Sequence, residues 1–376
     1  MIHTIRLSMS TFSRRQAALH ADSFGFTPDE IQKLIESPVQ ERAMIHKSLT
    51  MMCQGISSIV MCRTPIDNYS RFIFSLYLRI EPQRLLEGKR TIGLYHPSEE
   101  NNRRLITAFR KGMACILKEP ITPELYDLYS WKCNRIDYTA NLEFPTSKEA
   151  DLFLLLSHRT SRQIRRKQKK IKKCKESLQS SAEGNKSSKL IFYKKAKQID
   201  ETYTSISMDE REELKRDAES IIRFEIQCRK GKVYTLKQHY GFSDTCIMNF
   251  LNPDISMELL EKCYIQMVGE GDFFSLYHAR KKIMNSSYRE KEKEKLFNTI
   301  RLIAQSRGVI KGLLNFTHGD RIKNTEIIVK GTKTTFNKRL KELSQIGVNP
   351  YPIPKDWKIT YLQNPIDQIR RTSHPE

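Results

Sequence analysis

The sequence predicts an α+β fold, with an antiparallel sheet in the first two thirds of the chain and helices after it. Three segments with a period-two pattern, at 71–81, 134–144 and 221–229, predict strands. After about residue 236 the pattern changes to helices joined by short links. Because the strands gather before that point, we expect an α+β domain followed by a mainly helical one.

The length and the charge of the chain limit its organisation and its partners. At ~150 residues per domain, 376 residues suggest two domains with a small extra module. We expect a helical N-terminal segment at 1–55, an α+β domain at 56–236 and a helical C-terminal domain at 237–376. With 65 Lys and Arg against 43 Asp and Glu, the net charge is +22, which favours a polyanionic partner.

The sequence argues against several classes of protein. No stretch approaches the ~18 uncharged apolar residues of a membrane-spanning helix, and the N-terminal residues lack the apolar segment of a secretory signal. The eight cysteines form no CxxC pair, and there is no HExxH motif. A zinc site or a disulfide framework is therefore not expected, and a reducing cytoplasm fits the cysteine content.

The N-terminal half is expected to begin with helices and continue with strands. Residues 1–50 are polar and predict helices, with Thr27 as an N-cap and Pro28 at the first helical position. Residues 57–81 predict strands that end at Pro82. The next two predicted helices cover 101–118 and 123–131.

Two strands later in the chain have one polar and one apolar face. In 134–144 the polar face carries Arg135, Asp137 and other polar side chains, and Ile136 begins the apolar face. In 221–229 Arg223 and Glu225 lie on the polar face. The segments between these strands predict a helix at 147–176, a small-residue loop at 179–186, a short strand within 188–199 and an acidic helix at 207–220.

The last third of the chain predicts helices and an extended tail. The predicted helices cover 257–268, 275–286, 288–306 and 333–346. Asn349 is followed by Pro350, Pro352, Pro354 and Pro365, so the tail is expected to run extended over the surface.

A basic run in the second half of the helix predicted at 147–176 points to nucleic acid. Residues 159–175 hold ten Lys or Arg and no acid, whereas a solvated helix usually offsets its cations with acids four residues away. An external polyanion would supply the missing neutralisation. The candidate DNA-binding residues are Arg135, Arg159, Arg162, Arg165, Arg166, Lys167, Lys169, Lys170, Lys172, Lys173 and Arg223.

The polar strand faces and one tyrosine are candidates for chemistry. Taken singly, each face is either solvated or part of a site, but each centres an acid two residues after an arginine. If the two strands are neighbours, Asp137 and Glu225 could approach each other, and two carboxylates with water and phosphate suit Mg²⁺ or Mn²⁺. Tyr193 precedes Lys194 and Lys195. It is either an ordinary strand tyrosine or a nucleophile whose phenolate the lysines favour.

The ordered triplets Arg135-Ile136-Asp137, Tyr193-Lys194-Lys195 and Arg223-Phe224-Glu225 resemble the gene II/X family of filamentous-phage and plasmid replication proteins. The segment 78–88, which contains Pro82 followed by an apolar pair and a glycine, is similar to another strand of that family. The resemblance covers about residues 60–240. Its members are rolling-circle initiators that nick one strand of a duplex origin through a tyrosine.

The resemblance implies roles for individual residues of this chain. Tyr193 takes the role of nucleophile, and Asp137 and Glu225 take part in binding a divalent metal. The family often has an acid five residues after the tyrosine, where this chain has Gln198; Asp200 or Glu201 could replace it.

A mechanism follows as a hypothesis. Tyr193 attacks one phosphodiester, Mg²⁺ or Mn²⁺ polarises a non-bridging oxygen, and Lys194 or Lys195 lowers the pKa of the phenol or contacts the phosphate. The products are a 5′-phosphotyrosine and a free 3′-hydroxyl that primes the polymerase of a bacterial host. The expected partners are origin DNA, in single- and double-stranded form, and the host polymerase and helicase in the cytoplasm.

Two alternatives remain open from the sequence. A non-catalytic DNA-binding regulator or initiator would use the helix predicted at 333–346 for recognition, and would form no covalent adduct. A conjugative relaxase would share the chemistry and differ in the biological step. The sequence also leaves open whether a second tyrosine, such as Tyr203, takes part.

Overall fold

The computed structural model describes residues 1–37, 41–65, 72–117, 123–161, 172–173, 178–203 and 206–371. The chain divides into two compact units. Unit 1 comprises residues 1–139, 186–189 and 226–256, and unit 2 comprises residues 140–185, 190–225 and 257–376. Strands β5 (Lys132–Glu143), β8 (Ser188–Lys194) and β9 (Ile221–Arg229) each contribute residues to both units.

Unit 1 is built on an antiparallel sheet in the order β2-β3-β4-β1-β5. Its strands are β1 (Ile2–Phe12), β2 (Ala43–Ser48), β3 (Ile56–Pro65), β4 (Phe72–Ile80) and the first part of β5. Ile5 and Leu7 of β1 are buried, whereas Arg6 between them is exposed. The expectation that residues 1–55 are helical is therefore wrong: this segment holds two strands, and β1 pairs with both β4 and β5.

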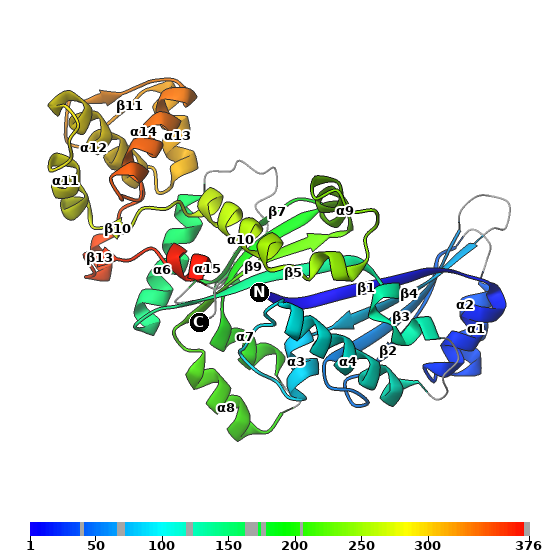
Figure 1. Ribbon diagram of the computed structural model, residues 1–376. Coiled ribbons are helices and arrows are strands. Elements are labelled where there is room, and N and C mark those ends of the chain that lie inside the picture. Colours follow the sequence, from blue (N-terminus) through cyan, green and yellow to red (C-terminus); the bar gives the residue numbers. More distant parts are fainter. Residues whose placement is uncertain are drawn as a thin grey trace. The chain divides into compact units, whose positions relative to one another are not determined.

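Helices cover the apolar face of the unit 1 sheet (Figure 1). They are α1 (Arg14–Ser23), α2 (Pro28–Glu36), α3 (Pro82–Glu87) and α4 (Glu99–Ile116). As predicted, α2 begins after Thr27, whose side chain accepts a hydrogen bond from the Glu30 amide, with Pro28 at the first position. The chain enters β3 through Gly55, which has φ +94° and approaches Leu85 so closely that an added Cβ would lie 2.5 Å from its backbone.

Shorter elements complete unit 1. They are α5 (Pro123–Tyr126), the 3₁₀ turns Leu128–Ser130 and Ile247–Phe250, and α9 (Lys230–His239). The buried hydroxyl of Tyr138 in β5 donates to the Phe250 carbonyl at 3.1 Å, which ties the second of these turns to the sheet.

Unit 2 contains the remaining part of the strands, in the order β5-β9-β8-β7-β6. β6 (Lys172–Lys173) and β7 (Leu178–Gly184) belong to it, with α6 (Ser147–Thr160), α7 (Lys195–Thr202), α8 (Met208–Asp217) and most of α10 (Pro253–Met267). An aromatic cluster forms its core. The ring of Phe192 stacks on Phe224 with centroids 4.6 Å apart, and Phe153 and Tyr264 surround this pair.

Two predicted elements between 147 and 186 differ in the structure. The helix predicted over 147–176 ends at Thr160, and Lys172–Lys173 are strand residues. Residues 162–171 and 174–177 lie outside the described residues. The segment predicted as a small-residue loop at 179–186 is mostly β7. Small polar residues lack the packing that marks a strand in sequence, and here pairing with a neighbouring strand decides the conformation.

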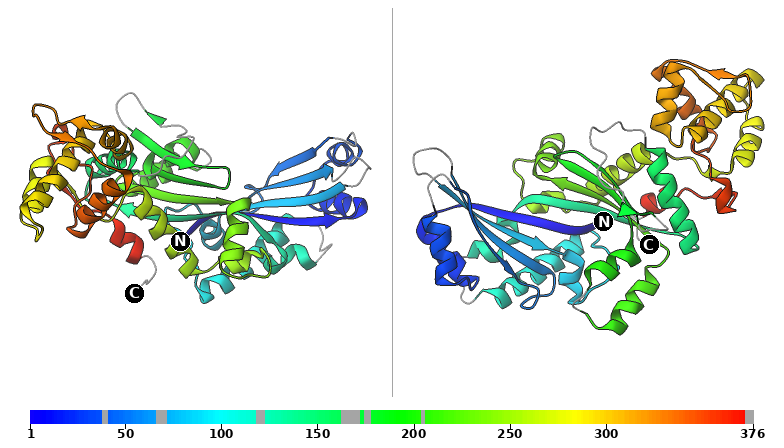
Figure 2. Two further views of the ribbon diagram at one scale, coloured as in Figure 1. Left: turned by 90° about the horizontal axis from the view of Figure 1, so that it is seen from above. Right: turned by 180° about the vertical axis from the view of Figure 1, so that it is seen from behind.

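The C-terminal part of unit 2 is mainly helical, as predicted. It contains α11 (Leu276–Met284), α12 (Glu290–Gln305), α13 (Val309–His318) and α14 (Lys333–Gln345), which gather into one cluster (Figure 2). The prediction missed α13. Two small antiparallel pairs, β10 (Phe273–Phe274) with β13 (Tyr361–Leu362) and β11 (Asp320–Arg321) with β12 (Ile328–Val329), and the short helix α15 (Ile366–Arg371) complete it.

The proline-rich tail differs from its expected surface course, because Asn349, Tyr351 and Ile353 are buried. The fold class is confirmed as α+β with a helical C-terminal region. Within the described ranges, no helix combines the length and the apolar content that crossing a bilayer requires.

Candidate active site

Tyr193 lies at the end of β8, immediately before α7 begins. Because neighbouring side chains of a strand point to opposite faces, the burial of Phe192 in the aromatic core places Tyr193 on the other face. There the Tyr193 hydroxyl donates to Glu225 Oε2 at 3.2 Å. Tyr193 is half-buried, whereas Glu225 on β9 is 4% exposed. The polar face that the sequence predicted for 221–229 thus meets the tyrosine within unit 2.

The surroundings of Tyr193 disfavour its ionised form. Burial raises the pKa of the phenol well above its usual value, and the negative charge of Glu225 adds to the rise. Arg223, whose charge and hydrogen bond stabilise the phenolate, opposes the rise only in part. Arg223 is fully buried, and its Nε donates to Asn141 Oδ1 at 2.9 Å. At neutral pH the phenol is therefore protonated, and a nucleophilic role requires a base.

Neither of the two lysines after Tyr193 is among the groups that shift the pKa of the phenol, and contact of Lys194 or Lys195 with the phosphate stays a prediction. Lys194 forms an ion pair with Asp151 of α6. Lys195 is fully buried, and its ammonium donates to Gln198 Oε1 at 2.7 Å and to the Tyr203 hydroxyl at 3.0 Å. These contacts fix the start of α7 beside the tyrosine.

Gln198 and the nearby Asp200 each contact a lysine of unit 2. Gln198 stands where the family often has an acid, and its side-chain oxygen accepts a hydrogen bond from the buried Lys195. Asp200 lies 3.3 Å from Lys215 of α8. Replacement of the missing acid by Asp200 or Glu201 stays a prediction.

Asp137 belongs to unit 1 and is held by an arginine. Arg135 donates to both of its carboxylate oxygens, from Nε at 2.7 Å and from Nη2 at 2.6 Å, and Asp137 is 1% exposed. This bidentate geometry is the strong form of the interaction. It occupies both oxygens that the sequence assigned to a metal ion.

The donor set suits a divalent ion only in part. Among the described residues, no group of three or more His, Cys, Asp or Glu side chains could hold a metal. Glu225 offers hard oxygen ligands, and Mg²⁺ often takes one or two carboxylates and completes its shell with water and substrate phosphate. The residues present therefore fit an ion that arrives with DNA rather than an all-protein cage.

Arginines on β1 and β4 lie beside Arg135 and were missed by the sequence analysis. Arg6 is the cross-strand partner of Arg135 on one side and of Arg79 on the other. Partial burial and the charges of these two arginines lower the pKa of Arg6, which Asp137 opposes. The period-two pattern of β1, in which Arg6 stands between two aliphatic residues, was the signal that could have revealed it.

The predicted DNA-binding residues have different outcomes. Arg223 is wrong as a direct DNA contact, because its side chain is fully buried. Arg159 near the end of α6 donates from Nη1 to the Arg307 carbonyl at 2.8 Å. Lys172 and Lys173 lie in β6. The others lie outside the described residues: Arg162, Arg165, Arg166, Lys167, Lys169 and Lys170.

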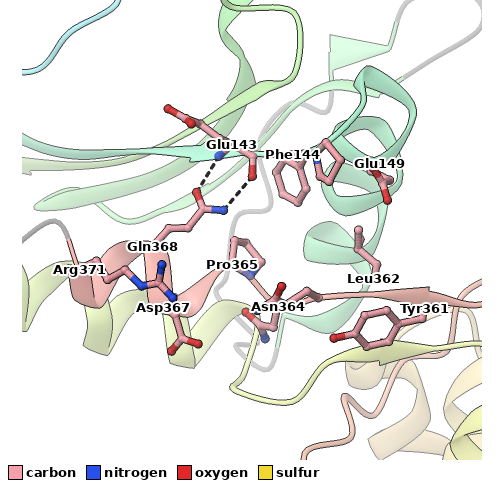
Figure 3. A pocket seen from close by; sticks show the side chains of 12 residues that line it. Glu143, Phe144, Glu149, Tyr361, Leu362, Asn364, Pro365, Asp367, Gln368 and Arg371 are labelled. Atoms are coloured by element: carbon pink, nitrogen blue, oxygen red, sulfur yellow. Dashed lines mark hydrogen bonds between the residues drawn. The ribbon is translucent and has the colours of Figure 1, made fainter.

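A pocket of about 470 Å³ in unit 2 contains none of the predicted site residues (Figure 3). It lies between the end of β5, the start of α6 and the C-terminal residues 361–371. The Gln368 side chain accepts from the Glu143 amide at 2.7 Å and donates to the Glu143 carbonyl at 2.8 Å. These two bonds tie α15 to β5, so the pocket is closed on one side by a structural contact.

A comparison with family models finds a match that includes the polar strands and Tyr193. The model that describes the N-terminal part of the gene II replication-associated protein matches residues 58–245, half of the chain. The chain belongs to this family. The recognition of the gene II family of phage rolling-circle replication proteins is thereby confirmed. The match covers β3 to β9 and so includes Asp137, Tyr193 and Glu225. Among curated proteins, none matches the chain.

Membership of the gene II family supports the role of rolling-circle replication initiator, and an initiator of replication binds DNA. The helices α11–α14 and the first strand of unit 1 lie outside the matched range.

Proposed function

We propose that this protein nicks and rejoins one DNA strand at a rolling-circle origin, with Tyr193 as the nucleophile. The hydrogen bond from the Tyr193 hydroxyl to Glu225 carries the proposal, because it pairs a nucleophile with a base on the polar face of β8 and β9. The family match supports the biological setting.

The reaction is an exchange of phosphodiester bonds. The Tyr193 oxygen attacks the phosphorus, the bond from phosphorus to the 3′-oxygen breaks, and a 5′-phosphotyrosine forms. Glu225 accepts the phenolic proton, and water protonates the released 3′-oxygen. Because the tyrosyl ester conserves the phosphodiester, the reverse attack by a 3′-hydroxyl rejoins the strand without ATP.

The neighbours of Tyr193 orient these groups. Arg223 lies beside the phenol and stabilises negative charge on its oxygen as the proton leaves. Lys195, buried against Gln198 and Tyr203, holds the first turn of α7 in place. Mg²⁺ or Mn²⁺, bound by Glu225 together with DNA phosphate and water, would supply Lewis-acid stabilisation at a non-bridging oxygen.

The test is a nicking assay on a supercoiled plasmid that carries the DNA flanking the gene. Tyr193→Phe should lose nicking and the SDS-stable adduct with labelled DNA, and should keep DNA binding. Tyr277→Phe is the matched control, since Tyr277 lies on α11 and is 73% exposed. Full nicking by Tyr193→Phe would assign the nucleophile elsewhere, and metal-independent binding without any adduct in the wild type would favour a DNA-binding regulator.

A further inference from the structure

Three arginines form a continuous row across the sheet of unit 1. Arg79 of β4, Arg6 of β1 and Arg135 of β5 are successive cross-strand partners. Directly paired side chains have Cβ atoms about 4.5–5.5 Å apart, and like charges in that arrangement destabilise a sheet. Arg229 of β9 adds a further positive charge near Arg6. Such a row costs stability unless something outside it compensates the charge.

The acids around the arginine row neutralise it only in part. Asp137 pairs with Arg135, and Glu81 lies 3.6 Å from Arg79. Arg6 is exposed and has no ion pair with any described residue. The side chains of Arg79 and Arg135 are 43% and 21% exposed. The row therefore presents net positive charge to solvent.

The arginine row lies on the polar face of the unit 1 sheet, where Arg6 is exposed and Arg79 and Arg135 are partly exposed. Helices α1–α4 cover the opposite, apolar face (Figure 1). Half-buried Tyr77 of β4 lies on the same face two residues before Arg79, beside Ser8 of β1. An aromatic ring next to a line of cations is the arrangement with which proteins bind single-stranded nucleic acid.

We infer that Arg79, Arg6 and Arg135 bind successive phosphates of a single DNA strand that crosses the strands of this sheet. The row spans roughly 10 Å, twice the spacing between strands, which matches two or three phosphates at a rise of ~3.4 Å or more per nucleotide. Tyr77 stacks on a base next to them. Asp137 acts as a positioning residue that orients the Arg135 guanidinium. The inference rests on the proposed function and adds how the strand is held.

The test measures binding of the full-length protein to a fluorescein-labelled single-stranded oligonucleotide and to its duplex, by anisotropy over a range of salt concentrations. The variants are Arg6→Gln and Arg79→Gln. Arg103→Gln is the matched control, because it removes the same charge from α4, where Arg103 is 72% exposed and paired with Glu99. Each row variant should reduce the salt slope for the single strand by ~0.7 and weaken binding about fivefold near 0.1 M salt.

The outcomes separate this inference from the proposed function. Arg6→Gln should raise the DNA concentration that gives half-maximal nicking about fivefold, whereas Tyr193→Phe should bind normally and not nick. Loss of affinity no greater than that of Arg103→Gln, or a changed slope for the duplex alone, would overturn the inference and leave the nucleophile untouched. Weaker binding with an unchanged slope would also overturn it, because a lost phosphate contact must change the slope.

Discussion

Replacing Glu225 by glutamine tests whether this carboxylate is the base for Tyr193. The side chains have nearly the same shape, and the amide can still accept the hydrogen bond that the phenol makes at 3.2 Å. The amide cannot accept a proton at neutral pH. Glu225→Gln therefore removes the proposed base and leaves the phenol in place.

The size of the effect follows from the state of the phenol. Burial, the largest cause of the raised pKa of Tyr193, remains in the variant, so little phenolate forms at neutral pH. A positioned general base contributes ~10²–10⁴-fold, or about 3–5 kcal/mol of activation free energy at 1.36 kcal/mol per tenfold. We expect the nicking rate of Glu225→Gln to fall by that factor near neutral pH.

The assay compares single-turnover nicking rates between about pH 7 and about pH 9. Without the base, the phenol must ionise alone, so the rate of the variant should rise about tenfold per pH unit below the pKa of Tyr193. Glu219→Gln is the matched control, since Glu219 is exposed and precedes β9. DNA affinity of each variant, measured by anisotropy, shows whether the fold is retained.

A wild-type rate in Glu225→Gln, with the same pH dependence as the unchanged protein, would refute the role of Glu225. A loss of rate that excess Mg²⁺ restores in full would show that the metal-binding role of Glu225, and not its role as a base, limits the rate. Equal losses in Glu225→Gln and Glu219→Gln would show that general charge, and not this hydrogen bond, decides the rate.

Three further predictions concern stability and are measured by urea unfolding. Gly55→Ala should lower the free energy of unfolding by at least about 2 kcal/mol more than Gly88→Ala does. Both glycines have a positive φ, but only at Gly55 would the new Cβ meet backbone atoms, 2.5 Å away at Leu85. Equal losses in the two variants would contradict this packing. Asp137→Asn should cost about 2 kcal/mol, less than the ~3–5 of a fully buried pair, because Arg135 retains contact with water; a loss under about 0.5 kcal/mol would mean that the pair is not stabilising. Tyr193 has a raised pKa in the folded protein, so its contribution is present below the unfolded value of about 10 and is lost as pH rises above it. Between about pH 9 and about pH 11 the wild type should therefore lose about 1 kcal/mol more than Tyr193→Phe, and identical losses would contradict the burial of the phenol.

The strands with strict alternation could be predicted, because the alternation of polar and apolar residues shows which side chains share a face of the sheet. In β5 and β9, bulky apolar residues alternate with Arg135, Asp137, Arg223 and Glu225. The polar residues share a face because the pleat requires it. The sequence could not give the partners of these polar groups. Pairing Asp137 with Arg135, and Glu225 with Tyr193, depends on rotamers and strand order rather than on the pattern.

The segments that were misjudged have weak local signals. In β1 polar residues stand between the aliphatic ones from the second position on, and the helices α1 and α2 follow directly. The overall polarity of residues 1–50 therefore concealed the alternation within β1. β7 consists largely of small polar residues that fit a loop equally well. The conformation of β7 depends on pairing with its neighbouring strands, and the local sequence of β7 does not indicate which strands these are.

The lysines beside Tyr193 show why adjacency in sequence is a poor guide to electrostatics. In a strand the next residue points to the opposite face, and Lys195 already begins a helix. Its ammonium reaches Gln198 and Tyr203, three and eight residues ahead. The charge that acts on the phenol comes instead from β9, thirty or more residues away along the chain.

Phe192 of the aromatic core and Tyr193 are neighbours in β8, so the register of this strand decides the position of both side chains. A slip of β8 by a single position would exchange the two faces. It would carry the Tyr193 hydroxyl into the aromatic cluster that contains Phe224 and Tyr264 and push Phe192 toward Glu225. Under the proposed function, a misaligned sheet would place no phenol beside Glu225, so the aromatic rings that stabilise the native alignment would also be required for nicking.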